Sequence, residues 1–179
     1  MVNLKYAVVE RERRWLLTAM PDDLVGETVL IRDRYLTGTR LRLREMTDEQ
    51  GSRVLKLGHK VRLDEGPRAV ACTSLYLDET EWARLAELPG RGLEKRRVRV
   101  SLDGVVVAVD EFQGDLSGLV LAEIDGGGKD VPPANWPVRS EVTDDERYTG
   151  AALALAARIP VVEGLPWVGR DILTSRYIE

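Results

Sequence analysis

Eight short segments of alternating side chains, joined by short turns, constrain the fold of this chain most. They span residues 6–17, 27–36, 39–46, 53–62, 69–77, 93–101, 104–112 and 118–125. Their β-branched and aromatic content and their period of two predict strands. Short links join antiparallel neighbours, so eight such strands favour a barrel or a sandwich. We expect an α+β fold dominated by β-structure.

Helices are expected at three places outside these strands. Asp78 can cap a helix over residues 79–88, and the alanine-rich stretch predicts a second over residues 144–158, with a break near Gly150 and an end before Pro160. A shorter helix is expected over residues 171–177, and a Gly/Pro-rich loop over residues 126–137. With no linker long enough to divide it, the chain of 179 residues predicts a single domain.

Composition and charge exclude several classes of function. A net charge of −4 argues against nonspecific nucleic-acid binding. No run of apolar residues is long enough to cross a membrane, and the first residues lack the apolar core of a signal peptide. The lone Cys72 fits a reducing compartment, and the single His59 excludes a Ser–His–Asp triad or a multi-histidine zinc site. We therefore expect a cytoplasmic protein without a nucleic-acid or membrane partner.

The first strand carries acidic side chains at every second position. Glu10, Glu12 and Arg14 share one face, because side chains alternate across a strand. Two carboxylates one pleat apart repel each other unless a cation lies between them. Mg²⁺ is a common choice, since it takes one or two protein carboxylates and leaves room for phosphate oxygens. The alternative is a solvated face of mixed charge.

Basic residues dominate the middle strands, and acids return in the last ones. The charged residues on one face of each later strand are Arg40, Arg42 and Arg44; Lys56 and Lys60; Lys95, Arg97 and Arg99; Asp110; Glu123 and Asp125. Arginine suits phosphate oxygens, so a polyanion is the natural partner of such a face. Closure of the sheet would bring the acids of the first and last strands together. A wet, polar barrel interior is one outcome, and a solvated outer face is the other.

Six short motifs in this order resemble those of the CYTH superfamily, also called triphosphate tunnel metalloenzymes. They are Glu10, Glu12 and Arg14 (E-x-E-x-K); Leu41-Arg42-Leu43-Arg44-Glu45 (R-x-R); Leu57-Gly58-His59-Lys60 (L-T-x-K); Lys95-Arg96-Arg97 (K-x-R); Val109-Asp110 with Gly118-Leu119 and Glu123-Ile124-Asp125 (I-D, G-L-x-x-x-E-x-E); and Glu141–Gly150 (E-V-T-x-D-x-R-Y-x-N). The resemblance covers residues 6–157 and leaves a helical extension over 158–179. Arg14 stands in place of a lysine, Asp125 of a glutamate and Gly150 of an asparagine.

The resemblance implies a closed, eight-stranded antiparallel barrel whose tunnel binds a triphosphate with Mg²⁺ or Mn²⁺. The implied metal ligands are Glu10, Glu12, Asp110, Glu123 and Asp125, for one or two ions. The implied phosphate-binding residues are Arg14, Arg40, Arg42, Arg44, Lys56, Lys60, Lys95 and Arg97. Catalytic roles are expected for Glu10, Glu12, Lys60 and Lys95.

The predicted activity is metal-dependent hydrolysis of a triphosphate, with inorganic triphosphate as the preferred substrate. Within the same fold the alternatives are a thiamine-triphosphatase, a nucleoside triphosphatase and an adenylate cyclase. From another class, the chain would be a non-catalytic polyphosphate or nucleotide sensor. Whether two subunits associate into a homodimer stays open.

Overall fold

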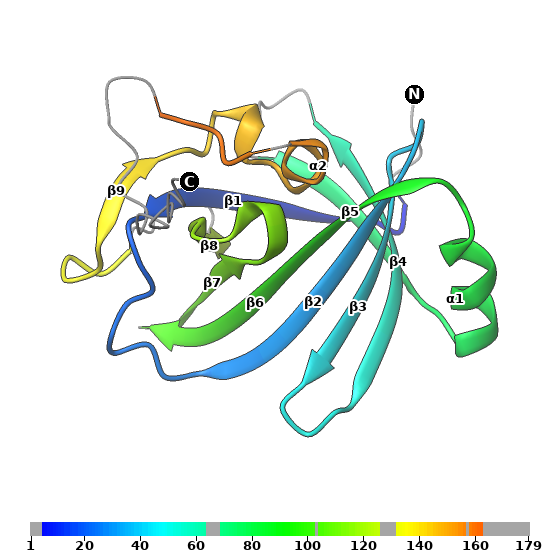
Figure 1. Ribbon diagram of the computed structural model, residues 1–179, viewed down its shortest axis with the longest axis horizontal. Coiled ribbons are helices and arrows are strands. Elements are labelled where there is room, and N and C mark those ends of the chain that lie inside the picture. Colours follow the sequence, from blue (N-terminus) through cyan, green and yellow to red (C-terminus); the bar gives the residue numbers. More distant parts are fainter. Residues whose placement is uncertain (1–4, 64–68, 103, 126–131, 157, 163–179) are drawn as a thin grey trace, which may run out of the picture.

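Eight antiparallel strands form a closed barrel, as predicted, and a ninth short strand lies at its edge (Figure 1). The computed structural model describes residues 5–63, 69–102, 104–125, 132–156 and 158–162. The strands are β1 (Val8–Leu17), β2 (Glu27–Leu36), β3 (Leu41–Asp48), β4 (Arg53–Arg62), β5 (Ala69–Tyr76), β6 (Gly90–Leu102), β7 (Val105–Phe112), β8 (Val120–Asp125) and β9 (Val138–Glu141). Each predicted strand is present, with ends shifted by a few residues.

The barrel closes through β1, which pairs with two strands along one edge. Around the barrel the order is β1-β8-β7-β6-β2-β3-β4-β5, and the first half of β1 completes the circle against β5, with Val8 opposite Cys72. The second half of β1 pairs instead with β9, where Trp15 lies opposite Glu141. β9 was not predicted. It covers an edge that β1 would otherwise leave unpaired beyond the end of its β5 pairing.

Two hairpin turns have the backbone that their glycines favour. Gly38, between β2 and β3, has φ of +72°, and Gly104, between β6 and β7, has φ of +81°. Glycine adopts this left-handed region without steric cost, so it sets tight links between neighbouring strands. These links keep β3 next to β2 and β7 next to β6.

The two faces of the strands belong to different clusters. One cluster contains Trp15, Leu17, Val98, Val100, Val107, Val109, Val120, Ala122, Ile124 and Trp136. A second contains Leu16, Leu93, Phe112, Leu116, Leu119, Leu121, Val142, Tyr148 and Leu153. Leu16 and Leu121 share strand faces with Glu12 and Glu123, whereas Trp15 and Ala122 point the other way. The second cluster therefore fills the part of the barrel interior next to the charged side chains.

The helices differ from the prediction in one place. α1 (Glu79–Ala86) has the predicted Asp78 cap and contacts β3 and β4; in Figure 1 it lies beside the barrel, on the side away from β9. The segment predicted as a helix over residues 144–158 with a break near Gly150 is divided just before Gly150, as expected, but its helical parts are shorter than predicted. Two short elements form there, η2 (Glu146–Tyr148) and α2 (Gly150–Leu155), because Asp145 caps the first and an extended Thr149 caps the second.

The remaining elements are minor. A short 3₁₀ helix, η1 (Gly114–Leu116), follows β7. The helix predicted over residues 171–177 lies outside the described residues. Within the part of the chain that the structure describes, no helix has the length and apolar character needed to span a membrane.

Candidate active site

A cavity of about 850 Å³ runs through the barrel interior. Of the thirteen predicted site residues, twelve line it: Glu10, Glu12, Arg14, Arg40, Arg42, Arg44, Lys56, Lys60, Lys95, Arg97, Glu123 and Asp125. They come from β1, β3, β4, β6 and β8, together with the turn before β3. The thirteenth, Asp110, is on β7 and is not a lining residue. The charged faces of separate strands therefore surround one space.

Positive charge dominates this cavity although the whole chain is acidic. The described lining residues include eleven arginines and lysines but four carboxylates, in a chain of net charge −4. Arg62, Arg91 and Arg99 belong to this set and were not predicted as site residues. Arg99 is on the same strand face as Lys95 and Arg97, so the alternation of side chains alone could have predicted it as a lining residue. So many cations around one space need an anionic guest or many waters to offset their repulsion.

Carboxylates and bases meet along β1. The ammonium of Lys60 donates to Glu10 Oε2 at 2.8 Å. Burial alone would lower the pKa of Lys60, but Glu12 and Glu10 outweigh it and raise that pKa above its ordinary value. The guanidinium of Arg14 bridges two acids, at 3.4 Å from Glu12 and 3.3 Å from Glu123. In this structure Glu10, Glu12 and Glu123 are thus held by cations of the chain itself.

Asp110 lies behind the lining and holds two cavity bases in place. Its carboxylate is fully buried and accepts hydrogen bonds from Lys95 Nζ at 2.5 Å and from Arg97 at 2.6 and 2.7 Å. Burial lowers the pKa of Lys95, and Asp110 only partly offsets this effect. Because both of its oxygens are occupied and it does not face the cavity, we leave Asp110 out of the proposed metal ligands.

Asp33 has the same role on β2 and was not predicted. Its carboxylate accepts two hydrogen bonds from Arg44, at 2.7 and 2.6 Å, and lies 3.5 Å from Arg42 Nε. Burial alone would raise the pKa of Asp33, but Arg44 outweighs it and lowers that pKa. Arg42 Nε is buried and has no hydrogen-bond partner among the described residues. Asp33 is thus the counter-ion of two arginine residues that line the cavity.

The donor chemistry of the cavity fits a hard divalent ion. Glu10, Glu12 and Asp125 offer carboxylate oxygens at its wall. Among the described residues, no three acidic, histidine or cysteine side chains gather closely enough to hold an ion on their own. Mg²⁺ commonly uses one or two carboxylates and completes its shell with water and substrate phosphates. The residues present therefore fit an ion that enters together with a phosphate ligand.

Tyr35 explains why residue 150 is a glycine. Thr149, Gly150, Ala151 and Leu155 of the α2 segment line the cavity together with Tyr35 of β2. A Cβ atom at position 150 would lie 2.0 Å from the Tyr35 hydroxyl oxygen. A side chain as large as asparagine cannot occupy this position while Tyr35 keeps its place.

We expect Gly150→Ala to lower the free energy of unfolding by about 1–3 kcal/mol, because the new methyl group overlaps the phenol oxygen. Urea denaturation measures the loss, and adding Tyr35→Phe should recover most of it by removing the oxygen. Gly92→Ala is the matched control, since nothing lies within 4 Å of a Cβ there, and it should change stability by less than about 0.5 kcal/mol. Equal losses at positions 92 and 150 would contradict the steric explanation.

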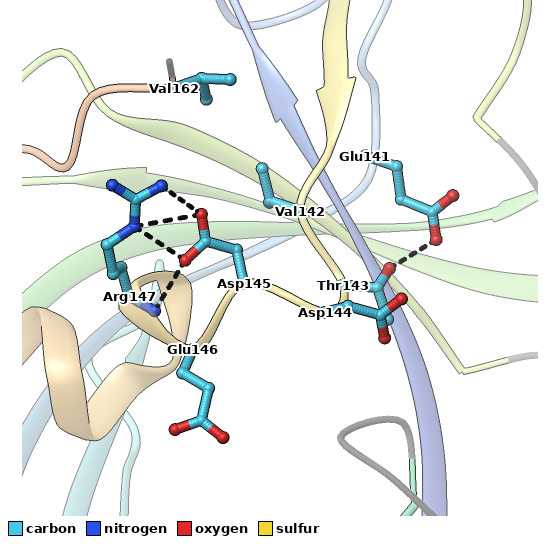
Figure 2. A pocket seen from close by; sticks show the side chains of 8 residues that line it. All are labelled: Glu141, Val142, Thr143, Asp144, Asp145, Glu146, Arg147 and Val162. Atoms are coloured by element: carbon cyan, nitrogen blue, oxygen red, sulfur yellow. Dashed lines mark hydrogen bonds and ion pairs between the residues drawn. The ribbon is translucent and has the colours of Figure 1, made fainter.

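The segment between β9 and α2 forms a second, acidic pocket of about 580 Å³ (Figure 2). Arg147 binds the carboxylate of Asp145, and the hydroxyl of Thr143 donates to Glu141 at 2.6 Å. None of the eight residues that line this pocket lines the barrel cavity. The Asp145–Arg147 contact shapes η2, and η2 in turn places Tyr148 in the interior apolar cluster. This segment thus fixes the position of α2 at the cavity.

Two solved structures of the protein NE1496 are similar to this chain over most of its length. One, described as an inorganic triphosphatase, is 30% identical over 85% of this chain and 100% of that chain, with a TM-score of 0.55. The other, described as a hypothetical protein, is 29% identical over 84% of this chain and 99% of that chain, with a TM-score of 0.56.

A protein from Bacillus halodurans, described as an adenylate cyclase candidate, is similar at the level of the fold. It is 16% identical over 69% of this chain and 83% of that chain, with a TM-score of 0.50. No family model matches the chain, and no curated protein matches it.

Proposed function

This chain belongs to the CYTH superfamily of triphosphate tunnel metalloenzymes, and from that premise we propose that it hydrolyses inorganic triphosphate with Mg²⁺ or Mn²⁺. The activity described for NE1496, inorganic triphosphatase, supports the proposal at 30% identity. The observation that carries it is the cavity in the barrel, where basic side chains from β3, β4 and β6 and carboxylates from β1 and β8 line one space.

The bases would bind the phosphate chain. The planar guanidinium of an arginine can donate two parallel hydrogen bonds to phosphate oxygens, whereas the ammonium groups of Lys60 and Lys95 act as compact point charges. Asp33 and Asp110 keep Arg44 and Arg97 in fixed positions, so the clamp is assembled before the substrate arrives. Such preorganised charge lowers the barrier to phosphoryl transfer, because no reorganisation is needed in the transition state.

Glu10 and Glu12, with Asp125 opposite Glu12 on β8, would hold the divalent ion. A bound ion of this kind neutralises charge on the transferring phosphoryl group and activates water as the nucleophile. These carboxylates would hold the ion, and the basic side chains that line the same cavity would orient the phosphates toward it.

The lining favours a substrate without an organic group. Tyr35 is the one aromatic side chain among the described residues that line the cavity. Stacking on aromatic side chains is a common way to hold a nucleobase. The single phenol ring of Tyr35, at the α2 end of the cavity, offers little stacking surface, whereas arginine and lysine side chains extend along the whole lining.

Phosphate release from triphosphate, thiamine triphosphate and ATP, each with Mg²⁺ or Mn²⁺, tests the proposal. We expect the fastest release from inorganic triphosphate and none after chelation of the metal. Faster release from ATP or thiamine triphosphate would change the assigned substrate. Cyclic AMP formation, or tight triphosphate binding without turnover under either ion, would contradict a hydrolase.

A further inference from the structure

Arg14 contacts two carboxylates, Glu12 of its own strand β1 and Glu123 of the neighbouring strand β8. In the strand register, Arg14 lies opposite Glu123, and Glu12 lies opposite Asp125. The Arg14 Nε atom donates to Glu123 Oε1 at 3.3 Å, and its Nη2 atom donates to Glu12 Oε2 at 3.4 Å. One planar guanidinium thus joins an acid of β1 to an acid of β8.

Glu123 has a second cation on its other oxygen. Arg97 Nη2 donates to Glu123 Oε2, and the same guanidinium is held by the buried Asp110. Both oxygens of the Glu123 carboxylate are therefore occupied by arginine.

Replacing these contacts by a metal ion would be costly. Arg14 and Arg97 are both buried and contact the two oxygens of Glu123, so a metal ion on Glu123 would place a divalent charge beside two buried guanidiniums. Glu10 differs, because its partner Lys60 is a flexible ammonium and the pair is partly exposed. Lys60 can move onto a phosphate oxygen when an ion takes its place, whereas Arg14 and Arg97 are fixed by two partners each.

We propose that Arg14 is a built-in cation that takes the place of a second divalent ion, so that the tunnel binds one metal ion, at Glu10 and Glu12. The inference rests on the proposed function, since it concerns the ion that accompanies the triphosphate. An arginine suits this role better than a lysine, because its fork reaches two carboxylates at once. Its charge is permanent, because an arginine side chain is not deprotonated in proteins.

Mn²⁺ stoichiometry, measured by equilibrium dialysis with a non-hydrolysable imidotriphosphate, tests the inference without an activity assay. We expect one Mn²⁺ per wild-type chain and two per chain in Arg14→Gln, because the variant leaves Glu12 and one oxygen of Glu123 without their cation. Arg13→Gln is the matched control, since Arg13 is the neighbour on the opposite face and pairs with Glu141; it should keep one ion. Two ions in the wild type, or one in Arg14→Gln, would overturn the inference.

Glu123→Gln gives a second test that does not depend on the folding of Arg14→Gln. If Glu123 is no ligand, this variant keeps one Mn²⁺ with unchanged affinity. A loss of Mn²⁺ affinity beyond about tenfold would make Glu123 a ligand and overturn the inference. Two ions in the wild type would leave the proposed triphosphatase intact, whereas no Mn²⁺ binding with the analogue would contradict both proposals.

Discussion

Asp110→Ala is expected to lower the free energy of unfolding by about 3–5 kcal/mol. The carboxylate is fully buried, and it is the hydrogen-bond partner of both Lys95 and Arg97. Removing it leaves two buried cations next to each other without their shared counter-ion. The lowered pKa of Lys95, caused by burial, indicates that this ammonium already lacks solvation.

Urea denaturation of wild type and variant measures this loss. Glu111→Ala is the matched control on the neighbouring position of β7, where Glu111 pairs with Arg96 and both side chains are 40% exposed. Exposed pairs contribute about 0–1 kcal/mol, so this variant should stay close to wild type. If the two variants lose equal stability, Asp110 is not the buried counter-ion that the structure describes.

The largest loss of activity is expected from Glu10→Gln and Glu12→Gln. Each should reduce triphosphate turnover by about 10²–10³-fold, the scale seen when one preorganised electrostatic group is lost from a transition-state site. An amide keeps the size of the side chain but removes the negative charge that would hold the ion. Both side chains are partly exposed, so the fold should survive the change.

Steady-state phosphate release measures both variants, with thermal unfolding as a check of the fold. Glu94→Gln is the control, because Glu94 is on the outward face of β6, where it pairs with Arg32. It should keep wild-type turnover. Unchanged turnover in both Glu10→Gln and Glu12→Gln would remove these carboxylates from the metal site.

Alternation of side chains carried most of what the sequence could predict. A strand residue and its second neighbour must share a face, so Lys95 and Arg97, or Glu10 and Glu12, could be assigned to one face together. Opposite charges on different strands then favoured a shared interior. The structure places twelve of the thirteen predicted residues around one cavity for this reason.

Partner choice within the barrel could not be predicted from the sequence. The alternation of side chains predicts that Asp110 lines the cavity. It lies instead between Lys95 and Arg97, because the β6–β7 register puts it opposite Arg97. Asp33 is paired with Arg44 through the β2–β3 register in the same way. A one-residue change of register would alter both contacts, and the charged positions of one strand alone do not specify which residue of the neighbouring strand lies opposite.

Contacts between distant segments also decided the errors in secondary structure. β9 has four residues, and it forms because the second half of β1 offers it an edge. The stretch before α2 has good helix formers, but the side chains of Asp145 and Thr149 hydrogen-bond to nearby backbone and divide it. Position 150 accommodates only glycine because of Tyr35, a residue more than a hundred positions earlier.

Anomalous diffraction from a crystal soaked with Mn²⁺ and imidotriphosphate tests the central claim most directly. We expect one manganese peak beside Glu10 and Glu12, with the phosphate chain inside the barrel against Arg42, Lys60 and Arg97. Phosphates bound on the outer surface of the barrel, with the interior occupied by water alone, would contradict the account.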